Sequence, residues 1–543
     1  MKRWTIAALA VLTLGLSPAP SDAASPDYCA PTVDMDPLQL LRQASLDLRG
    51  TVPTYEEYEW VRGSEDAQQT AEDLIEEMYE SEDYFSQIRD YHQSLIWGTL
   101  DATVIDRLFA GQRLLFRNGS QIWRNTNMRR AYRGDLLDCL NQEQTEFDAE
   151  GRPVPIQTYV DPVCTGPGDT CQREGFVWVN PFWAPETQVK VCAFDAQESQ
   201  VGENGVSCSV YHTNDEECGC GPNLDWCGPA TVGPENQLIR DSLAEEPARI
   251  FEWVVRDGRS YLEAFTTDTT FVNGPVSHFY RNSTGTQTLE QSGAKAYETE
   301  ITDVPVLPYV DVDTWVPVQR GDAHAGAFTT LGYLMRFASN RGRANRFATA
   351  FYCEPFVPKE DGLPPEEAEP DPNLRDRAGC NDCHERLEPL AAHWARWRTG
   401  GTYGYFRPEA VSFEEPREDC ICGDALGTNC SAFCSTYFVT ADNSGDEEFG
   451  AYQGLPQAGS WLEGEDPTNV ASGPVGLIDT ADERDRIAQC AVRNLSEHLL
   501  GRELTADDLT WREGHAQAFE DDGYDYTGLV RRLVADDRYR TIR

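Results

Sequence analysis

Residues 378–398 read AGCNDCHERLEPLAAHWARWR and contain the pattern C-x-x-C-H at Cys380, Cys383 and His384. Cysteines at i and i+3 lie on one side of a helical turn, so both thiols can form thioethers to the two vinyl groups of one haem. The imidazole of His384 follows directly and can act as the proximal ligand of the iron. The pattern therefore predicts one covalent c-type haem, held by a helical domain that we place at residues 346–413.

The same pattern also allows a local disulfide between Cys380 and Cys383, with His384 as an ordinary surface residue. The chain has 17 cysteines, an odd number, so counting them does not separate the two interpretations. The preceding residues RDRAG and the following residues ERLEPL are typical of a loop that leads into a helix rather than of a stapled turn. The sequence therefore favours haem attachment.

The sixth ligand of the iron is not specified, because no methionine follows the motif. Met335, in LGYLMRF, is a distal candidate, although a methionine on such an apolar helix more often packs in a core. His324 and His498 are further candidates, whereas His393 follows His384 on the same helix and cannot easily reach the opposite face of the same haem. An open site remains equally compatible. An iron with an open sixth position would suit chemistry on a small molecule, whereas an iron with six ligands transfers electrons.

Residues 1–23 are typical of a cleaved secretory signal. Lys2 and Arg3 precede an apolar run from Ile6 to Leu16, and small residues surround a plausible cleavage site. The run is too short to cross a bilayer comfortably, and no later stretch approaches its length. We therefore predict export to the periplasm, the cell surface or the extracellular space, with no transmembrane span.

Export predicts that most of the cysteines form disulfides, because the compartment is oxidising. One cluster of seven cysteines lies between Cys164 and Cys227, and a cluster of four lies between Cys420 and Cys434. A four-cysteine zinc site is the competing account of the second cluster. That cluster contains no histidine, and export argues against free thiolates, so disulfides are favoured.

The charge of the chain limits its partners. It has 91 acidic and 45 basic residues, which gives a formal net charge of −46. Nucleic acid is a poor partner for such a chain, because phosphate backbones are bound by surplus basic charge. A redox partner would instead present a basic patch. The chain has no P-loop, no G-x-S-x-G and no H-E-x-x-H pattern, so nucleotide-binding, serine-hydrolase and zinc-protease functions have no support.

The pattern of apolar residues predicts a mainly α multidomain protein with an inserted disulfide-rich β/loop module and a c-type haem-binding helical domain. Leu38, Leu41 and Leu48 share a helical face that ends at Gly50, and TVPTYEE opens a second helix with capping-box spacing. Short β-like runs such as GFVWVNPFW and TQVKVCAF indicate strands in the module. Besides the signal and the haem domain, we expect five parts: a helical domain at 24–129, the Cys-rich β/loop insertion at 130–234, a central helical domain at 235–345, a Cys-rich loop segment at 414–474, and a C-terminal helical domain at 475–543.

Several segments resemble planctomycete-type cytochrome c multidomain proteins, most of whose parts are domains of unknown function. AGCNDCHERLEPLAAHWARWRTGG, with AHAGAFTTLGYLMRFASNRGRANRFATAFYCEPF upstream, is similar to their haem-bearing domain. Three more stretches agree in the same order, and together the quoted stretches cover a little under a third of the chain. They are LLRQASLDLRGTVPTYEEYEWV with LIEEMYESEDYFSQIRDYHQSLIW, then WVVRDGRSYLEAFTTDTTFVNGPVSHFY, then IAQCAVRNLSEHLLGRELTADDL with LVRRLVADDRYRTIR.

The resemblance implies a secreted bacterial haem protein with a redox function, and it carries over only Cys380, Cys383 and His384. Relatives usually have Asp-Pro followed by Leu-Gly after the motif, whereas residues 388–391 read EPLA here. This difference leaves the attachment residues intact, but the resemblance then carries over no distal pocket.

The leading hypothesis is an exported c-type cytochrome-like protein with one haem, which transfers electrons in the periplasm or at the cell surface. One alternative is a haem oxidase or peroxidase with an open distal site. Another is a disulfide-rich surface protein whose Cys-rich modules bind a partner or a polysaccharide, with the haem auxiliary or absent. The covalent haem content separates the last hypothesis from the first two.

Overall fold

A computed structural model provides the structure of the chain. It describes residues 33–542 apart from 102–112, 118–120, 126–131, 137, 165, 203–207, 209–217, 228–233, 284–287, 290–293, 296–302, 322–323, 357–373, 376, 396, 398–414, 432–433, 436–437, 442–452 and 457–468. The predicted signal at 1–23 and Cys29 lie outside the described residues.

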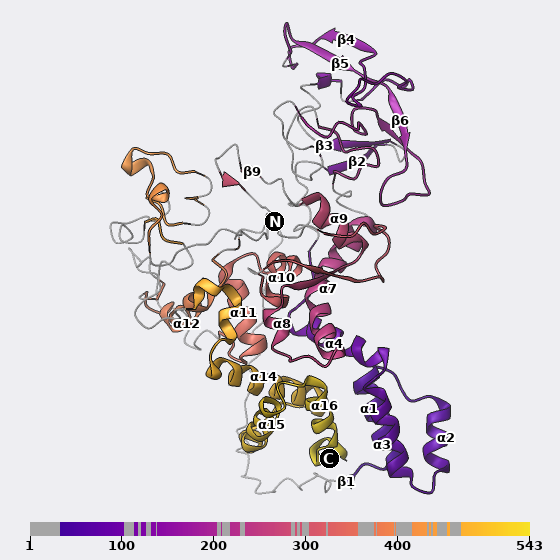
Figure 1. Cartoon of the computed structure of the whole chain (residues 1–543), viewed down its shortest axis with the longest axis vertical. Coiled ribbons are helices and arrows are strands. Elements are labelled where there is room, and N and C mark those ends of the chain that lie inside the picture. Colours follow the sequence, from indigo (N-terminus) through magenta and orange to yellow (C-terminus); the bar gives the residue numbers. More distant parts are fainter. Residues whose placement is uncertain are drawn as a thin grey trace, which may run out of the picture.

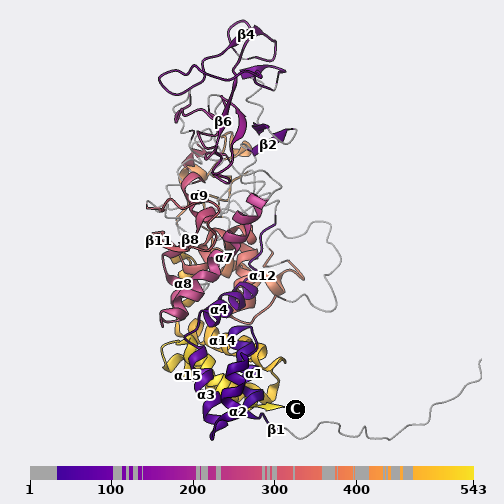
Figure 2. The same ribbon diagram turned by 90° about the vertical axis from the view of Figure 1, so that its right-hand side faces the viewer.

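The described chain is about half helical, with small sheets and several disulfides, which confirms the predicted mainly α fold with a disulfide-rich module at this coarse level. Figures 1 and 2 show the sheets of the module at one end of the molecule and the N- and C-terminal helices at the other. None of the described helices combines the length and the apolar character that are needed to cross a bilayer.

The N-terminal helices begin and end where their capping residues predict. In α1 (Pro37–Arg49), Asp36 caps the N-terminus and Gly50 ends the helix in the left-handed conformation, with φ of 68°. In α2 (Tyr55–Gly63), Thr54 and Glu57 form the predicted capping box. Two further helices follow, α3 (Ala67–Met78) and α4 (Glu82–Leu95), and Ser81 caps the second of them.

The central part is organised around the long helix α7 (Pro234–Arg256), which packs against α4. A two-stranded antiparallel sheet of β8 (Thr269–Val272) and β11 (Val316–Gln319) lies beside it, and Thr270 pairs with Val318. Four further elements complete this part: α8 (Glu263–Thr266), α9 (Gly274–Ser283), the 3-10 helix η2 (Gly326–Thr329) and α10 (Leu331–Arg336).

The β module begins earlier than the predicted position 130. Its four-stranded sheet has the order β2-β3-β7-β6, and β2 (Arg113–Arg117) and β3 (Gln121–Asn125) precede that boundary. The predicted runs form β6 (Phe176–Val179) and β7 (Val189–Cys192), and a hairpin of β4 (Gln157–Val160) and β5 (Thr170–Arg173) completes the module. Its disulfides are Cys139–Cys192, Cys164–Cys171, Cys208–Cys218 and Cys220–Cys227.

The second cysteine cluster consists of disulfides. Cys420 pairs with Cys434, and Cys422 pairs with Cys430. These bonds consume the four thiols that a zinc site would need, so the predicted choice of disulfides is confirmed.

The helical parts share one continuous hydrophobic core, which runs from Leu40 to Tyr539 and includes Trp394. The helices around the C-x-x-C-H pattern are α11 (Asn340–Phe351), which spans the predicted boundary between residues 345 and 346, and α12 (Asn381–Ala392). The C-terminal elements are η7 (Val470–Ile478), α14 (Ala481–Leu500), η8 (Ala506–Asp508), α15 (Leu509–Asp521), α16 (Tyr526–Ala535) and α17 (Asp537–Arg540). The two ends of the described chain meet, because β1 (Val33–Asp34) pairs with β12 (Thr541–Ile542). The parts predicted as separate helical domains are therefore packed as one body.

A buried histidine lies where α4 packs on α7. The imidazole of His92 is fully buried and stacks on the ring of Phe251, with 4.3 Å between ring centroids. Its Nδ1 donates to the carbonyl oxygen of Ile88 at 2.7 Å, and its Nε2 accepts from the hydroxyl of Tyr261 at 3.1 Å. Burial lowers the pKa of His92 to about 4.

We expect the protein to lose stability as the pH falls from about 6.5 to about 4, because the unfolded chain binds a proton that folded His92 does not. The shift corresponds to roughly 3 kcal/mol in the free energy of unfolding. This contribution is present at pH values above the pKa of His92 in the unfolded chain, and it is lost at pH values below the pKa of His92 in the folded protein. His92→Phe keeps the ring packing and removes the titration. Urea midpoints of both proteins between pH 7 and pH 4 test this: the variant should show the shallower loss, and parallel losses would contradict the assignment.

Candidate functional site

The C-x-x-C-H residues form the first turn of α12. Gly379 has φ of 77° and turns the chain into the helix. A residue with a Cβ would adopt this left-handed conformation only under strain. The N–H of Cys380 donates to the carbonyl of Arg377 at 3.0 Å. The N–H groups of Cys383 and His384 both donate to the carbonyl of Cys380, at 3.2 and 3.0 Å. One turn of backbone therefore brings the three predicted residues together.

Cys380 and Cys383 are the two cysteines without a disulfide partner among the described residues. The other described cysteines form seven disulfides. Both free thiols are partly exposed. The local disulfide that the sequence left open is thus not formed here, and both sulfurs are available for thioether bonds.

The imidazole of His384 is held from one side by a buried carboxylate. Its Nδ1 lies 2.5 Å from Oε1 of Glu388, one turn further along α12. The side chain of Glu388 is only 3 % exposed. A ring N–H that donates to a carboxylate fixes the tautomer, so that Nε2 carries the lone pair that binds a metal. Nε2 of His384 makes no hydrogen bond within the described part of the chain.

The same carboxylate oxygen also accepts from a cation on a neighbouring helix. Nε of Arg341, at the start of α11, lies 2.7 Å from Oε1 of Glu388. The side chain of Arg341 is 40 % exposed, whereas that of Glu388 is enclosed. Glu388 therefore joins the imidazole of His384 to α11 through a single oxygen atom.

The C-terminal end of α12 is anchored in the core. The indole N–H of Trp394 donates to the carbonyl of Phe328 at 3.1 Å. His393 donates through Nδ1 to the carbonyl of Gly473 at 2.8 Å, and burial lowers the pKa of His393 to about 4. His393 is therefore neutral near pH 7 and fixes α12 against η7. These contacts hold the helix that carries His384 in one orientation.

The three distal-ligand candidates lie in different environments. Met335 is 2 % exposed in the hydrophobic core, on α10. His324 is buried beside η2, with its Nδ1 3.3 Å from the hydroxyl oxygen of Thr329. His498 lies in the last turn of α14 and packs against the ring of Tyr91, 5.2 Å between centroids. The distal ligand stays a prediction.

The sequence analysis did not assign a role to Glu388 or to Arg341. The spacing of His384 and Glu388 is i,i+4, which places both side chains on one face of a helix and was a usable signal. Arg341 stands 47 residues before Glu388. No local pattern links them, since their contact depends on the packing of α11 against α12.

The site as a whole offers two thiols without disulfide partners and one oriented imidazole. These groups match the donor set of a c-type haem, which takes two thioethers and an axial histidine. Comparisons with protein-family models, with curated proteins and with solved structures find no match for this chain.

Proposed function

We propose that the protein is an exported c-type cytochrome-like protein that carries one covalent haem and transfers electrons in the periplasm or at the cell surface. The observation that carries the proposal is the state of the cysteines. Among the described residues, only the two thiols of C-x-x-C-H remain outside disulfides. Haem attachment explains both their spacing and the histidine that follows. The resemblance to planctomycete-type cytochrome c multidomain proteins points the same way.

In this proposal, Cys380 and Cys383 would form the thioethers and His384 would bind the iron through Nε2. When bound, the haem supplies reversible one-electron chemistry. Glu388 accepts the Nδ1–H of His384, which leaves Nε2 as the ring nitrogen that would face the iron. The hydrogen bond from the indole of Trp394 to Phe328, just after α12, anchors the helix that carries His384.

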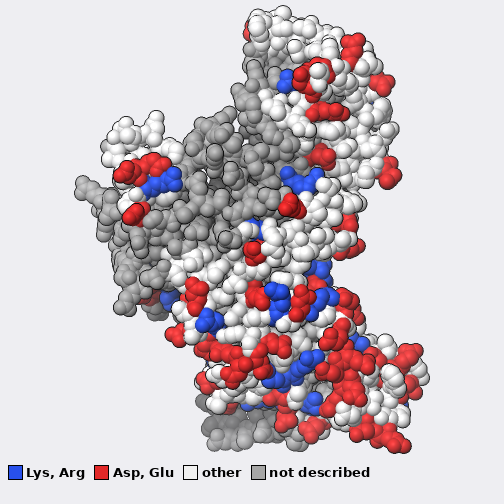
Figure 3. Space-filling view, viewed as in Figure 1, with Lys and Arg blue, Asp and Glu red and all other residues white. Residues whose placement is uncertain are grey.

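The proposed setting follows from the disulfides and the charge. Seven disulfides among the described residues suit an exported protein. Figure 3 shows acidic side chains over much of the N- and C-terminal helices, in keeping with the net charge of −46. A redox partner with a basic patch would be attracted to such a surface, with an association rate that falls as salt is added.

The test is to produce the protein in cells that mature c-type cytochromes and to measure its haem. A pyridine haemochrome assay should give one haem per chain, and the haem should stay with the polypeptide on a denaturing gel. Spectra of the oxidised, reduced and carbon-monoxide-treated protein complete the test. Absence of covalent haem would overturn the proposal, and rapid carbon monoxide binding by the reduced protein would replace electron transfer with oxidase or peroxidase chemistry.

A further inference from the structure

We propose that Glu388 and Arg341 set the reduction potential of the haem iron in opposite directions, through the single carboxylate oxygen that both His384 and Arg341 contact. The proposal rests on the proposed haem function. Its geometric basis is the pair of contacts at Oε1 of Glu388, 2.5 Å from Nδ1 of His384 and 2.7 Å from Nε of Arg341.

The carboxylate acts on the iron through the imidazole. A carboxylate that accepts the Nδ1–H draws positive charge toward itself and leaves Nε2 a stronger electron donor. A stronger donor stabilises the oxidised iron more than the reduced iron, because the oxidised iron carries the larger positive charge. Glu388 is almost fully enclosed, and a hydrogen bond is electrostatically stronger in such surroundings than in water. Glu388 therefore lowers the potential.

Arg341 acts on the carboxylate and not on the imidazole. Its guanidinium is always charged, and it contacts the oxygen that also accepts from His384. A cation at that oxygen reduces the negative charge that the imidazole experiences, so the hydrogen bond to His384 is weaker than it would be alone. Arg341 therefore raises the potential and limits the effect of Glu388.

This role depends on the contact between two helices. Arg341 belongs to α11 and Glu388 to α12, so a movement of one helix against the other changes the 2.7 Å contact without touching His384. The two residues are positioning residues in this scheme, because both act through His384. A purely structural role for the pair would change stability, but it would not shift the potential in opposite directions for the two substitutions.

The test compares the midpoint potentials of three single variants with that of the holoprotein at one fixed pH. Glu388→Gln keeps the shape and removes the charge, so the equilibrium constant for reduction should rise by about tenfold, which is about 59 mV for one electron. Arg341→Gln should lower the potential. Arg386→Gln is the control, because Arg386 is a cation on α12 that pairs with Glu354 instead of Glu388. It should shift the potential by much less than Arg341→Gln.

The outcomes separate this inference from the proposed function. Covalent haem is measured first, and its absence in the unmodified protein overturns the proposed function itself. With haem present, unchanged potentials in Glu388→Gln and Arg341→Gln, or shifts of the same sign in these two variants, would overturn the role of the pair. A shift in Arg386→Gln equal to that in Arg341→Gln would overturn it as well. If Glu388→Gln does not mature, Arg341→Gln still decides. It alters a side chain that is 40 % exposed, and a potential no lower than that of Arg386→Gln contradicts the proposal.

Discussion

Replacing Cys380 and Cys383 together with alanine is expected to abolish covalent haem and to leave the helical fold in place. Neither thiol takes part in a disulfide, so the change removes no cross-link. Cys383 stands in the first turn of α12, where alanine favours the helix more than cysteine does, and Cys380 is the N-cap but makes no capping hydrogen bond through its side chain. Haem staining on a denaturing gel should fall from full to none. The far-ultraviolet circular dichroism should keep its helical signal.

The control for this double variant is Asn381→Ala with Asp382→Ala, which changes the two residues between the cysteines and keeps the pattern. It should retain one haem per chain. Each single cysteine variant should retain haem through one thioether, with an absorption band shifted in the pyridine haemochrome spectrum, because one vinyl group is then unsaturated. Full covalent haem in the double cysteine variant would contradict the assignment of these residues.

Local features of the fold could be predicted from the sequence, because their causes are local. Asp36 and Gly50 bound α1, and Thr54 with Glu57 starts α2, through contacts within a few residues. The first turn of α12 is of the same kind, since C-x-x-C-H specifies the positions of its own side chains along one helix. The chemical candidates at 380, 383 and 384 therefore did not depend on knowledge of the tertiary structure.

Features that join distant parts of the chain could not be predicted in the same way. The hydroxyl of Tyr539 donates to Asp47 at 2.7 Å, and that of Tyr84 donates to Thr527 at 3.2 Å, so the terminal helices form one body. No local pattern in either terminal segment predicts its contact with the other. The contact of Arg341 with Glu388 is equally non-local. The sequence thus identified the groups that would bind the haem. The packing of α11 on α12 brought together the groups that would change its reduction potential.

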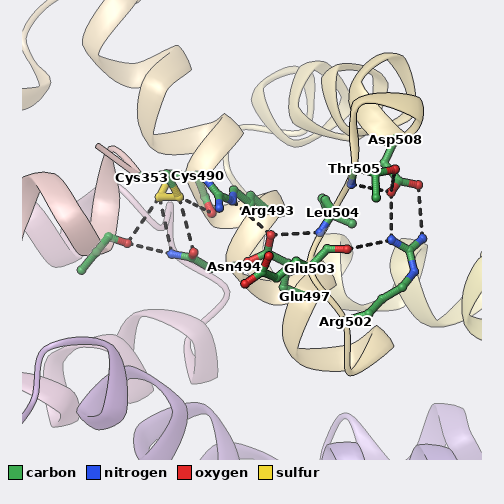
Figure 4. Close-up of polar contacts among 11 residues, drawn as sticks. Cys353, Cys490, Arg493, Asn494, Glu497, Arg502, Glu503, Leu504, Thr505 and Asp508 are labelled. Carbon is green, nitrogen blue, oxygen red and sulfur yellow. Dashed lines mark hydrogen bonds and ion pairs between the residues drawn. A yellow bond between two sulfur atoms is a disulfide. The ribbon is translucent and has the colours of Figure 1, made fainter. Parts of the chain in front are cut away.

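A disulfide that no local pattern predicted leads to the second large expected effect. Cys353 follows α11 and is bonded to Cys490 in α14, across a sequence separation of 137 residues. Figure 4 shows the bond beside Asn494, whose side-chain amide donates to the carbonyl of Ala350 at 2.9 Å. The bond therefore ties the helix that carries Arg341 to the C-terminal helices.

Replacing Cys353 and Cys490 together with serine should lower the free energy of unfolding of the helical body by several kcal/mol. Closing a loop of this length removes chain entropy worth about 5 kcal/mol from the unfolded state, an upper value because the loop contains two smaller disulfides. The measurement is the urea midpoint of helical circular dichroism under oxidising conditions.

The matched control is the double serine variant at Cys164 and Cys171, which opens a separation of only 7 residues in the β module. The same relation gives about 2.5 kcal/mol for such a loop. Because that bond lies outside the helical body, the helical transition should hardly move.

Equal shifts in the two variants, or no shift for Cys353 and Cys490, would show that hydrophobic packing alone holds α11 on α14. In that case the geometry at Arg341 would not depend on the disulfide. If the expected shift is found, the bond stabilises the helical body chiefly by restricting the unfolded chain.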